Sequence, residues 1–487
     1  MSDGVREADG PELTSLTGKT VGKVRLALYG IVNLPISIVG LPIALYIPAF
    51  YSQNLGLSLA AVGILIALSR LTDVVTDPAI GIASDRWHTR FGRRKPWIVV
   101  GMPLKLLALW MLFVPDSSFA LSVWHFMGGE SISNLYLFVW ISLLYLGFTV
   151  MDLPYRAWGA ELSPHYDERS KVTGWREAFG YGGTLMALTI PLVMSLVFDK
   201  PGAHNALFAI AVVVVIMMPL LTMPALLGVR EQPARAAPAT RIGWRRGLKI
   251  VWSNGPYRRL VISFLFLVIA VSMTASLSFF FVGSVMGETF DRYAIFILAY
   301  YLASSAAIPA WFAISRRFGK HKTVVIGILW LSLWSAFIPL LGPGDYWLFF
   351  AIMMLKGSAV GALVFLPASM AADVVDLDTL RTGEQRTGLY FSLWGMVNKA
   401  AVALGVLFAT TGVTWFGFDP TLDENTATAN LALACLYSII PAAIACIALP
   451  LLRKYPLTKA RQERMRAHIA RRDLRRAEAQ AQAGANP

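Results

Sequence analysis

Long apolar blocks separated by short polar segments dominate the pattern of this sequence. Each block holds about 20 residues or more, which is the length of helix that crosses a bilayer. We count twelve blocks: residues 24–50, 58–84, 96–115, 132–160, 175–198, 206–229, 257–285, 292–315, 322–342, 345–372, 387–412 and 429–452. The pattern therefore predicts an all-α membrane protein with twelve spanning helices.

The polar segments between the blocks alternate in charge. Residues 85–95, 230–259 and 316–322 are rich in Lys and Arg, whereas the segments on the alternate side contribute only Lys200 and Arg292. Cytoplasmic loops are enriched in Lys and Arg, so the alternation predicts that both termini are cytoplasmic. We expect an integral protein of the plasma (inner) membrane.

The blocks divide into two sets of six. A basic, Pro-containing segment lies between the sets, and a related basic motif follows the second block of each set, at 91–95 and at 315–322. Parallel repeats of six helices are the layout of the major facilitator fold. The predicted organisation is an N-terminal segment 1–23, a first half 24–229, a linker 230–256, a second half 257–452 and a basic tail 453–487.

Composition narrows the class of function. Of the 487 residues, 56% are apolar and 15% are charged, and the mean hydropathy is +0.58. The formal net charge of +14 is spread over the loops, so we expect the lipid bilayer as a partner and no nucleic acid. The sequence has no Walker motif and no catalytic set, so we expect neither an enzyme nor an ATP-driven pump. We expect a monomer with no cofactor apart from a coupling sodium ion or proton.

Carboxylates inside the blocks are the first candidate site. Asp73 and Asp77 lie four residues apart and share one helix face, and Asp152 lies within the fourth block. Each ionised Asp at mid-bilayer costs roughly 2.5–3.5 kcal/mol, which suggests a function. With the hydroxyls of Thr76 and Thr149 they offer oxygen ligands, which suit a hard cation such as sodium. The alternative is a set of structural ion pairs with Arg70, Arg156 or Arg176.

Cationic and aromatic residues are candidates for a substrate cavity. Lys399 lies inside the eleventh block, where a lysine normally faces a polar cavity, and a static salt bridge between the halves is the alternative. Aromatic rings stack on sugar rings, although most Trp and Tyr here fit an interfacial belt. The expected substrate-binding set is Asp152, Arg156, Trp158, Arg176, Trp394 and Lys399.

Charged residues at the ends of blocks two and ten form a candidate gate. Arg93 and Arg94 lie in the first basic motif, and Asp373 and Asp376 close the tenth block. We expect ion pairs between acidic and basic segments that break in one conformation. A solvated loop of mixed charge is the alternative.

Several of these motifs resemble one family of transporters. They are Asp73-x-x-Thr-Asp77-Pro78-x-x-Gly81, the run 92–97, Met151-Asp152-Leu-Pro154, Asp373-Val-Val-Asp376 and Phe391-Ser-Leu-Trp394-Gly-x-x-Asn398-Lys399. Together they are similar to the glycoside–pentoside–hexuronide:cation symporters of the major facilitator superfamily, whose best-known member is melibiose permease. The resemblance covers most of residues 24–450.

The resemblance implies a function and a site. It implies a cation site of Asp73, Thr76, Asp77, Thr149 and Asp152, sugar contacts from Asp152 and Arg176, and Lys399 nearby as a cavity charge. Coupling would use sodium, lithium or protons. Ser37 and Arg156 replace residues that contact sugar in galactoside carriers.

We therefore expect a secondary transporter that takes up a sugar or glycoside by alternating access. A lipid, amphiphile or drug transporter on the same fold is the alternative. A membrane receptor that does not transport is a further one.

Overall fold

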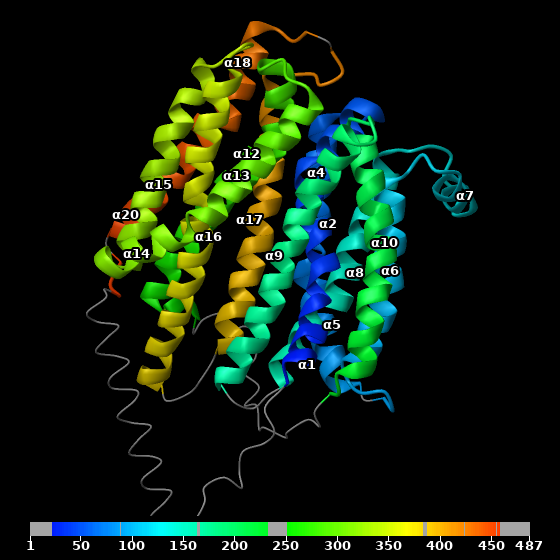
Figure 1. Ribbon diagram of the computed structural model, residues 1–487, viewed down its shortest axis with the longest axis vertical. Coiled ribbons are helices and arrows are strands. Elements are labelled where there is room, and N and C mark those ends of the chain that lie inside the picture. Colours follow the sequence, from blue (N-terminus) through cyan, green and yellow to red (C-terminus); the bar gives the residue numbers. More distant parts are fainter. Residues whose placement is uncertain are drawn as a thin grey trace, which may run out of the picture.

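The computed structural model describes residues 22–87, 89–162, 166–231, 251–382, 387–422, 424–453 and 455–457. Most of the predicted N-terminal segment 1–23, linker 230–256 and tail 453–487 lies outside the described residues. The two halves of the chain form two adjacent groups of helices (Figure 1). The division of the chain into these five parts stays a prediction.

Helices make up the whole framework of the described chain. The first half contains α1 (Lys23–Ile31), α2 (Asn33–Leu45), α3 (Ile47–Ala49), the π-helix η2 (Phe50–Asn54), α4 (Leu59–Leu71), α5 (Asp73–Arg86), α6 (Lys95–Phe113), α7 (Ser118–Phe126), α8 (Asn134–Glu161), α9 (Tyr166–Leu196) and α10 (Ala203–Gly228). The second half contains α12 (Gly255–Phe280), the π-helix η3 (Phe281–Val285), α13 (Phe290–Ala306), α14 (Ile308–Phe318), α15 (Lys320–Phe337), the 3₁₀ turn η4 (Ile338–Leu340), α16 (Tyr346–Thr382), α17 (Thr387–Trp415), α18 (Ala427–Tyr437), α19 (Ile439–Cys446) and α20 (Ala448–Arg453).

The number of spans agrees with the sequence pattern. Among the described residues, 11 stretches of helix are long and apolar enough to cross a membrane. The helices α13 and α14 meet at a 40° bend and make a twelfth span if they count as one. Pro309 follows this bend, and proline cannot donate the backbone hydrogen bond that would continue a straight helix. The all-α prediction is confirmed.

The second span carries the candidate carboxylates near its middle. It runs as one helix from Leu59 to Ser84, and its two parts, α4 and α5, meet at Thr72, whose φ and ψ are helical. The Thr72 hydroxyl donates to the Ser69 carbonyl at 2.6 Å, a side-chain bond that competes with the regular backbone pattern. Asp73 and Asp77 follow on α5, directly before Pro78.

Two glycines bring α6 and α8 unusually close. A Cβ atom on Gly147 would lie 2.8 Å from the Cα of Lys105, and one on Gly101 would lie 2.8 Å from the Met151 nitrogen. Small residues at such contacts let membrane helices approach at backbone distance. The result places Lys105 of α6 beside the part of α8 that carries Asp152.

Side chains of the two halves pack against each other at one end of the bundle. We call the end with residues 86–95 and 316–322 the basic end, and the other the opposite end. At the opposite end Ser195 donates a hydrogen bond to Asp291, and the rings of Tyr46 and Tyr293 lie 6.2 Å apart. Gly63 of α4 touches Thr410 of α17, where an added Cβ would come 1.7 Å from the Thr410 hydroxyl. The halves are therefore closed against each other at the opposite end.

Candidate functional site

A cluster of charges joins the two halves. Lys399 of α17 places its Nζ 2.6 Å from an Oδ2 of Asp77 and 3.1 Å from the Oδ2 of Asp73, both on α5. The other oxygen of Asp77 accepts a hydrogen bond of 2.8 Å from the Thr149 hydroxyl of α8. Arg70 lies 3.4 Å from Asp73. We call these five residues the charged cluster, and with two acidic and two basic groups its formal charge is zero.

Two side-chain oxygen atoms of α5, one of them in the cluster, lack a hydrogen-bond partner among the described residues. Asp73 is 2% exposed, and its Oδ1 is buried without a hydrogen-bond partner among the described residues. The Thr76 hydroxyl is buried in the same unsatisfied state. A buried polar atom without a partner costs free energy, and carboxylate and hydroxyl oxygens are ligands for hard cations. The donor set of Asp73, Asp77, Thr76 and Thr149 therefore fits a sodium ion chemically.

An apolar cavity of about 260 Å³ lies next to the charged cluster, between α4, α5 and α17. Its charged lining consists of Arg70, Asp73, Asp77 and Lys399. The rest of the lining is aliphatic: Ile64, Ala67, Leu68, Leu71, Val74, Met396, Ala400, Ala403, Leu404 and Leu407. The cavity thus offers a long apolar wall with charges gathered in one place.

Asp152 belongs to a different ion pair. Its Oδ1 lies 3.6 Å from Nζ of Lys105, a residue of α6 that is completely buried. Among the described residues, no three Asp, Glu, His or Cys side chains are grouped so that they could hold a metal ion. The structure thus separates the predicted metal set, with Asp73 and Asp77 on Lys399 and Asp152 on Lys105.

Sequence reasoning missed Lys105, although a signal was present. Lys105 is a single lysine within an apolar block, which is the same argument that identified Lys399. Lys356 of α16 carries the same signal and is 1% exposed. Both lysines could have been selected from the sequence, but their partners could not.

The remaining predicted substrate residues lie outside the lining of this cavity. Trp158 is buried against the ring of Tyr29, with 5.6 Å between centroids. Trp394 stacks on Phe264 at 3.9 Å. Arg176 pairs with Glu177 at 2.6 Å, and Arg156 is exposed. Of the predicted substrate set, the structure places Lys399 at the cavity.

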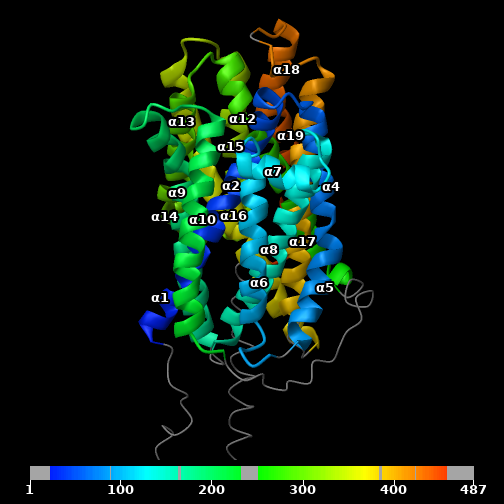
Figure 2. The same ribbon diagram turned by 90° about the vertical axis from the view of Figure 1, so that its right-hand side faces the viewer.

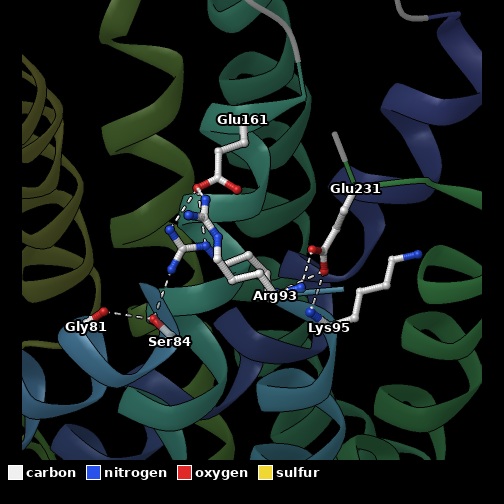
Figure 3. A network of polar contacts seen from close by, with 7 residues as sticks. Gly81, Ser84, Arg93, Lys95, Glu161 and Glu231 are labelled. Carbon is white, nitrogen blue, oxygen red and sulfur yellow. Dashed lines mark hydrogen bonds and ion pairs between the residues drawn. The ribbon is translucent and has the colours of Figure 1, made fainter. Parts of the chain in front are cut away.

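The first half of the predicted gate is an ion-pair network within the N-terminal half (Figure 3). Arg93 and Arg94 reach one oxygen of Glu161 at the end of α8, at 2.6 and 2.8 Å. Arg94 also donates to the Ser84 hydroxyl of α5 at 2.9 Å. Partial burial acts to raise the pKa of Glu161, but hydrogen bonds from Arg94 and Arg93 outweigh it and lower that pKa.

Glu231 caps the start of α6 in the same network (Figure 3). Its carboxylate accepts from the backbone N–H groups of Arg93, Arg94 and Lys95, at 2.7, 3.0 and 2.6 Å. The first N–H groups of a helix lack partners within the helix, and an anion there is favoured by the helix dipole. Glu231, at the start of the predicted linker, is thereby fixed to the first basic motif.

The second half of the predicted gate is arranged in the same way. Asp373 of α16 accepts a 2.6 Å hydrogen bond from Lys320, the first residue of α15. Asp376 lies one turn further along α16 and is half-buried. Arg93, Arg94 and Asp373 thus each bind a partner within their own half. A gate that joins the halves stays a prediction.

Comparison with known proteins assigns the chain to a family. The model of the family described as "MFS/sugar transport protein" matches residues 28–459. The chain belongs to this family. The narrower group of glycoside–pentoside–hexuronide symporters is not distinguished by this match. As a member of a transporter family the chain is an integral membrane protein and not an enzyme.

Relatives in the family include lipid transporters and bacterial symporters. The chain is 24% identical over 477 residues to the sodium-dependent lysophosphatidylcholine symporter 1-A of Danio rerio, covering 89% of this chain and 86% of that one. It is 25% identical over 453 residues to the sphingosine-1-phosphate transporter MFSD2B of Mus musculus, covering 88% of each chain. It is 24% identical over 412 residues to the inner membrane symporter YicJ of Escherichia coli, covering 82% and 84%.

Solved structures share the fold. The nucleoside transporter NupG matches with a TM-score of 0.62 and 14% identity, over 90% of this chain and 100% of that one. A bacterial homologue of the human lysosomal transporter Spinster, in an inward-facing and unoccupied conformation, matches with a TM-score of 0.62 and 14% identity, over 90% and 98%. At this level of identity the likeness concerns the fold alone.

Proposed function

We propose that this transporter is a sodium-coupled symporter of an amphiphile that has a phosphate-containing head and one apolar chain, as lysophospholipids do. The observation that carries the proposal is the cavity between α4, α5 and α17, whose aliphatic wall adjoins the charged cluster. An apolar chain gains free energy from such a wall, at about 25 cal/mol per Å² buried, whereas sugar hydroxyls would lose hydrogen bonds there. The head group would lie at the charges.

The relatives support the same substrate class. Proteins named for lysophosphatidylcholine and sphingosine-1-phosphate transport match this chain over most of its length. The main expectation from the sequence was a sugar or glycoside, and the comparisons favour the amphiphile that the sequence left as the alternative. The aromatic residues expected to stack on a sugar ring, Trp158 and Trp394, are outside the cavity lining.

The charged cluster offers a physical basis for coupling. Lys399 pairs with Asp73 and Asp77 of α5, so a sodium ion and the Lys399 ammonium would compete for these two carboxylates. Binding of sodium by Asp73, Asp77, Thr76 and Thr149 would release the ammonium and give the neutral cluster a net positive charge. A released Lys399 would then attract the phosphate of the substrate. Each ligand therefore favours binding of the other, and this coupling is reciprocal.

The contacts between the halves support transport by alternating access. The halves are closed at the opposite end, where Gly63 meets Thr410. If the basic end is cytoplasmic, as the excess of Lys and Arg in its loops predicts, closure at the opposite end supports an inward-facing state.

Uptake into proteoliposomes tests the proposal. Purified protein would be given an inward sodium gradient, a proton gradient or neither, and offered lysophosphatidylcholine, melibiose or a nucleoside. We expect sodium-dependent uptake of the lysolipid, because its apolar chain can pack on the aliphatic wall and its phosphate can pair with Lys399. Uptake of melibiose without uptake of the lysolipid would overturn the substrate class. Uptake driven by protons alone would overturn sodium coupling.

A matched pair of variants tests whether the cation site lies on α5. We expect Asp77→Asn to reduce sodium-dependent uptake by about 100-fold, because Asp77 bonds both Lys399 and Thr149. The control is Asp419→Asn, which changes an exposed loop carboxylate bonded to Thr421. Asp419→Asn should leave uptake unchanged. Equal uptake by both variants would contradict the assignment of the cation site to α5.

A further inference from the structure

The short helix α7 breaks the correspondence between the halves. In the N-terminal half, residues 114–133 connect α6 to α8 and contain α7. The corresponding connection of the other half, between η4 and α16, spans residues 341–345. Five residues are enough to join the corresponding helices of the C-terminal half. The connection that contains α7 is therefore longer than the link from α6 to α8 requires, and we look for a separate role for α7.

Specific contacts fix one side of α7 to the bundle. The Ser117 hydroxyl accepts from the backbone of Ala120 at 3.2 Å and from Nε1 of Trp110 at 3.3 Å, which caps α7 and ties it to α6. Trp124 is 5% exposed and packs edge-on against Tyr136 of α8, with 5.0 Å between centroids. Its Nε1 donates to the Ser131 carbonyl at 3.0 Å. The helix is therefore held in a defined orientation.

The other sides of α7 are sorted by polarity. Phe119 and Phe126 lie seven residues apart, so they share one face, and they are 53% and 92% exposed. Met127 follows α7 directly and is also exposed, at 53%. Ser118, Ser122 and His125 follow a separate stripe at spacings of four and three residues. The helix thus has a bundle face, an apolar face and a polar face.

The position of α7 identifies what covers the apolar face. Figure 1 shows α7 standing out beside α6 and α10, below the upper end of the bundle, and Figure 2, viewed from that side, shows it in front of the bundle. Trp110 of α6 is half-buried and bonds to the Ser117 cap of α7, and aromatic residues of this kind gather where membrane and water meet. Leu135, at the start of the adjoining span α8, is 61% exposed, so the apolar face continues the lipid-facing surface of that span.

We propose that α7 lies in the headgroup region of the leaflet at the opposite end, with Phe119, Phe126 and Met127 inserted among the lipid chains. Helices with this division of faces lie flat in the interface, with the apolar side buried about 5–10 Å deep. The polar stripe of Ser118, Ser122 and His125 then faces water. Because this anchor belongs to one half, it holds the N-terminal half at a fixed depth.

The charges near α7 define the lipid. Residues 114–133 contain Asp116 and Glu130 and no Lys or Arg. Attraction of basic residues to anionic lipids therefore contributes nothing here, and the apolar side chains carry the interaction. The partner is a zwitterionic lipid surface such as phosphatidylcholine, and added salt should not release the helix.

Depth measurements with a fluorescent label test the proposal. In a background where Cys435 and Cys446 are changed to alanine, Phe126→Cys would carry the label in nanodiscs of phosphatidylcholine. We expect strong quenching by a nitroxide near the lipid headgroup, weaker quenching by a nitroxide near the chain end, and protection from aqueous iodide. A label at Ser122→Cys, on the polar stripe, should be open to iodide.

The matched control is Leu422→Cys. Leu422 is also an exposed apolar residue, 55% exposed, in the loop between α17 and α18. We expect its label to be quenched by iodide and little affected by lipid nitroxides. If the label at position 126 is as open to iodide as the label at 422, the proposal is wrong. If quenching at 126 requires anionic lipid, the proposed partner is wrong.

Discussion

The two halves of the bundle bury a lysine in opposite ways. In the N-terminal half, Lys105 lies 3.6 Å from the Asp152 carboxylate. In the C-terminal half, Lys356 is as deeply buried, but no ion pair with a carboxylate is found for it among the described residues, where neither of the two amines makes a hydrogen bond. Each Nζ also lies over an aromatic ring, Phe148 at 3.6 Å and Tyr437 at 5.1 Å. Burial of a lysine therefore does not itself create a carboxylate partner.

The difference shows where charge is used in the molecule. All three carboxylates of the predicted cation set belong to the N-terminal half, and each lies near a lysine. The C-terminal half contributes Lys399, which pairs with two of these carboxylates. Its buried lysine, Lys356, is surrounded by aliphatic residues of α12, α15 and α19. We infer that ion coupling is centred on the N-terminal half, with Lys399 as the link to its partner half.

Replacing each buried lysine by methionine should give the largest difference between the halves. Lys105→Met leaves Asp152 without its ammonium, and breaking a buried pair costs about 3–5 kcal/mol. Lys356→Met removes an amine that has no partner and fills its place with an apolar chain, so stability should be unchanged or raised. Thermal unfolding of the two purified variants in the same detergent measures both effects.

A double variant distinguishes the pair from simple packing. Lys105→Met combined with Asp152→Asn should recover part of the lost stability, because the unpaired charge is removed. An equal loss of stability in Lys105→Met and Lys356→Met would contradict the comparison. It would mean that both lysines are held by contacts other than a carboxylate.

The fold was predictable because each span carries its own signal. Length and hydropathy identify a helix such as α10 without knowledge of its neighbours. The hydrogen bond from the Thr72 hydroxyl to the Ser69 carbonyl, directly before Asp73, was not predicted. Hydrophobic periodicity does not record local side-chain bonds of this kind.

The candidate site was predictable as a set of residues but not as a set of contacts. Asp73, Asp77 and Lys399 could be selected because each is a charge within an apolar block. The approach of Lys105 to Asp152 could not be predicted, because it depends on the close packing of α6 and α8 that Gly101 and Gly147 allow. Pairing between spans is decided by helix packing, on which a single sequence carries little information.

Closure between the halves can be disturbed at Gly63. We expect Gly63→Ala to weaken the contact at the opposite end by about 1–3 kcal/mol, because the new methyl group overlaps the Thr410 hydroxyl. Spin labels on α4 and α17 near that end should then show a larger distance. Adding Thr410→Ala removes the closest atom and should restore part of the closure.

The control for this variant is Gly40→Ala on α2. A Cβ on Gly40 would meet nothing within 4 Å, so the label distance should not change. An unchanged distance in Gly63→Ala would show that α4 and α17 have room to adjust. The halves would then be held together by other contacts, such as Ser195 with Asp291.

The smallest expected effect is the pH dependence of the network at the basic end of the N-terminal half. Hydrogen bonds from Arg94 and Arg93 lower the pKa of Glu161 below its usual value of 4.5. A carboxyl with a lowered pKa in the folded state stabilises the protein above its unfolded-state pKa, and this contribution is lost as the pH falls through the lower value. The thermal midpoint of the wild type should therefore exceed that of Glu161→Gln at neutral pH, and the difference should shrink as the pH falls below 4.5.

Glu130→Gln, at an exposed loop carboxylate, serves as the control and should show no such difference. A difference between wild type and Glu161→Gln that is independent of pH would show that Glu161 acts through packing and not through its charge.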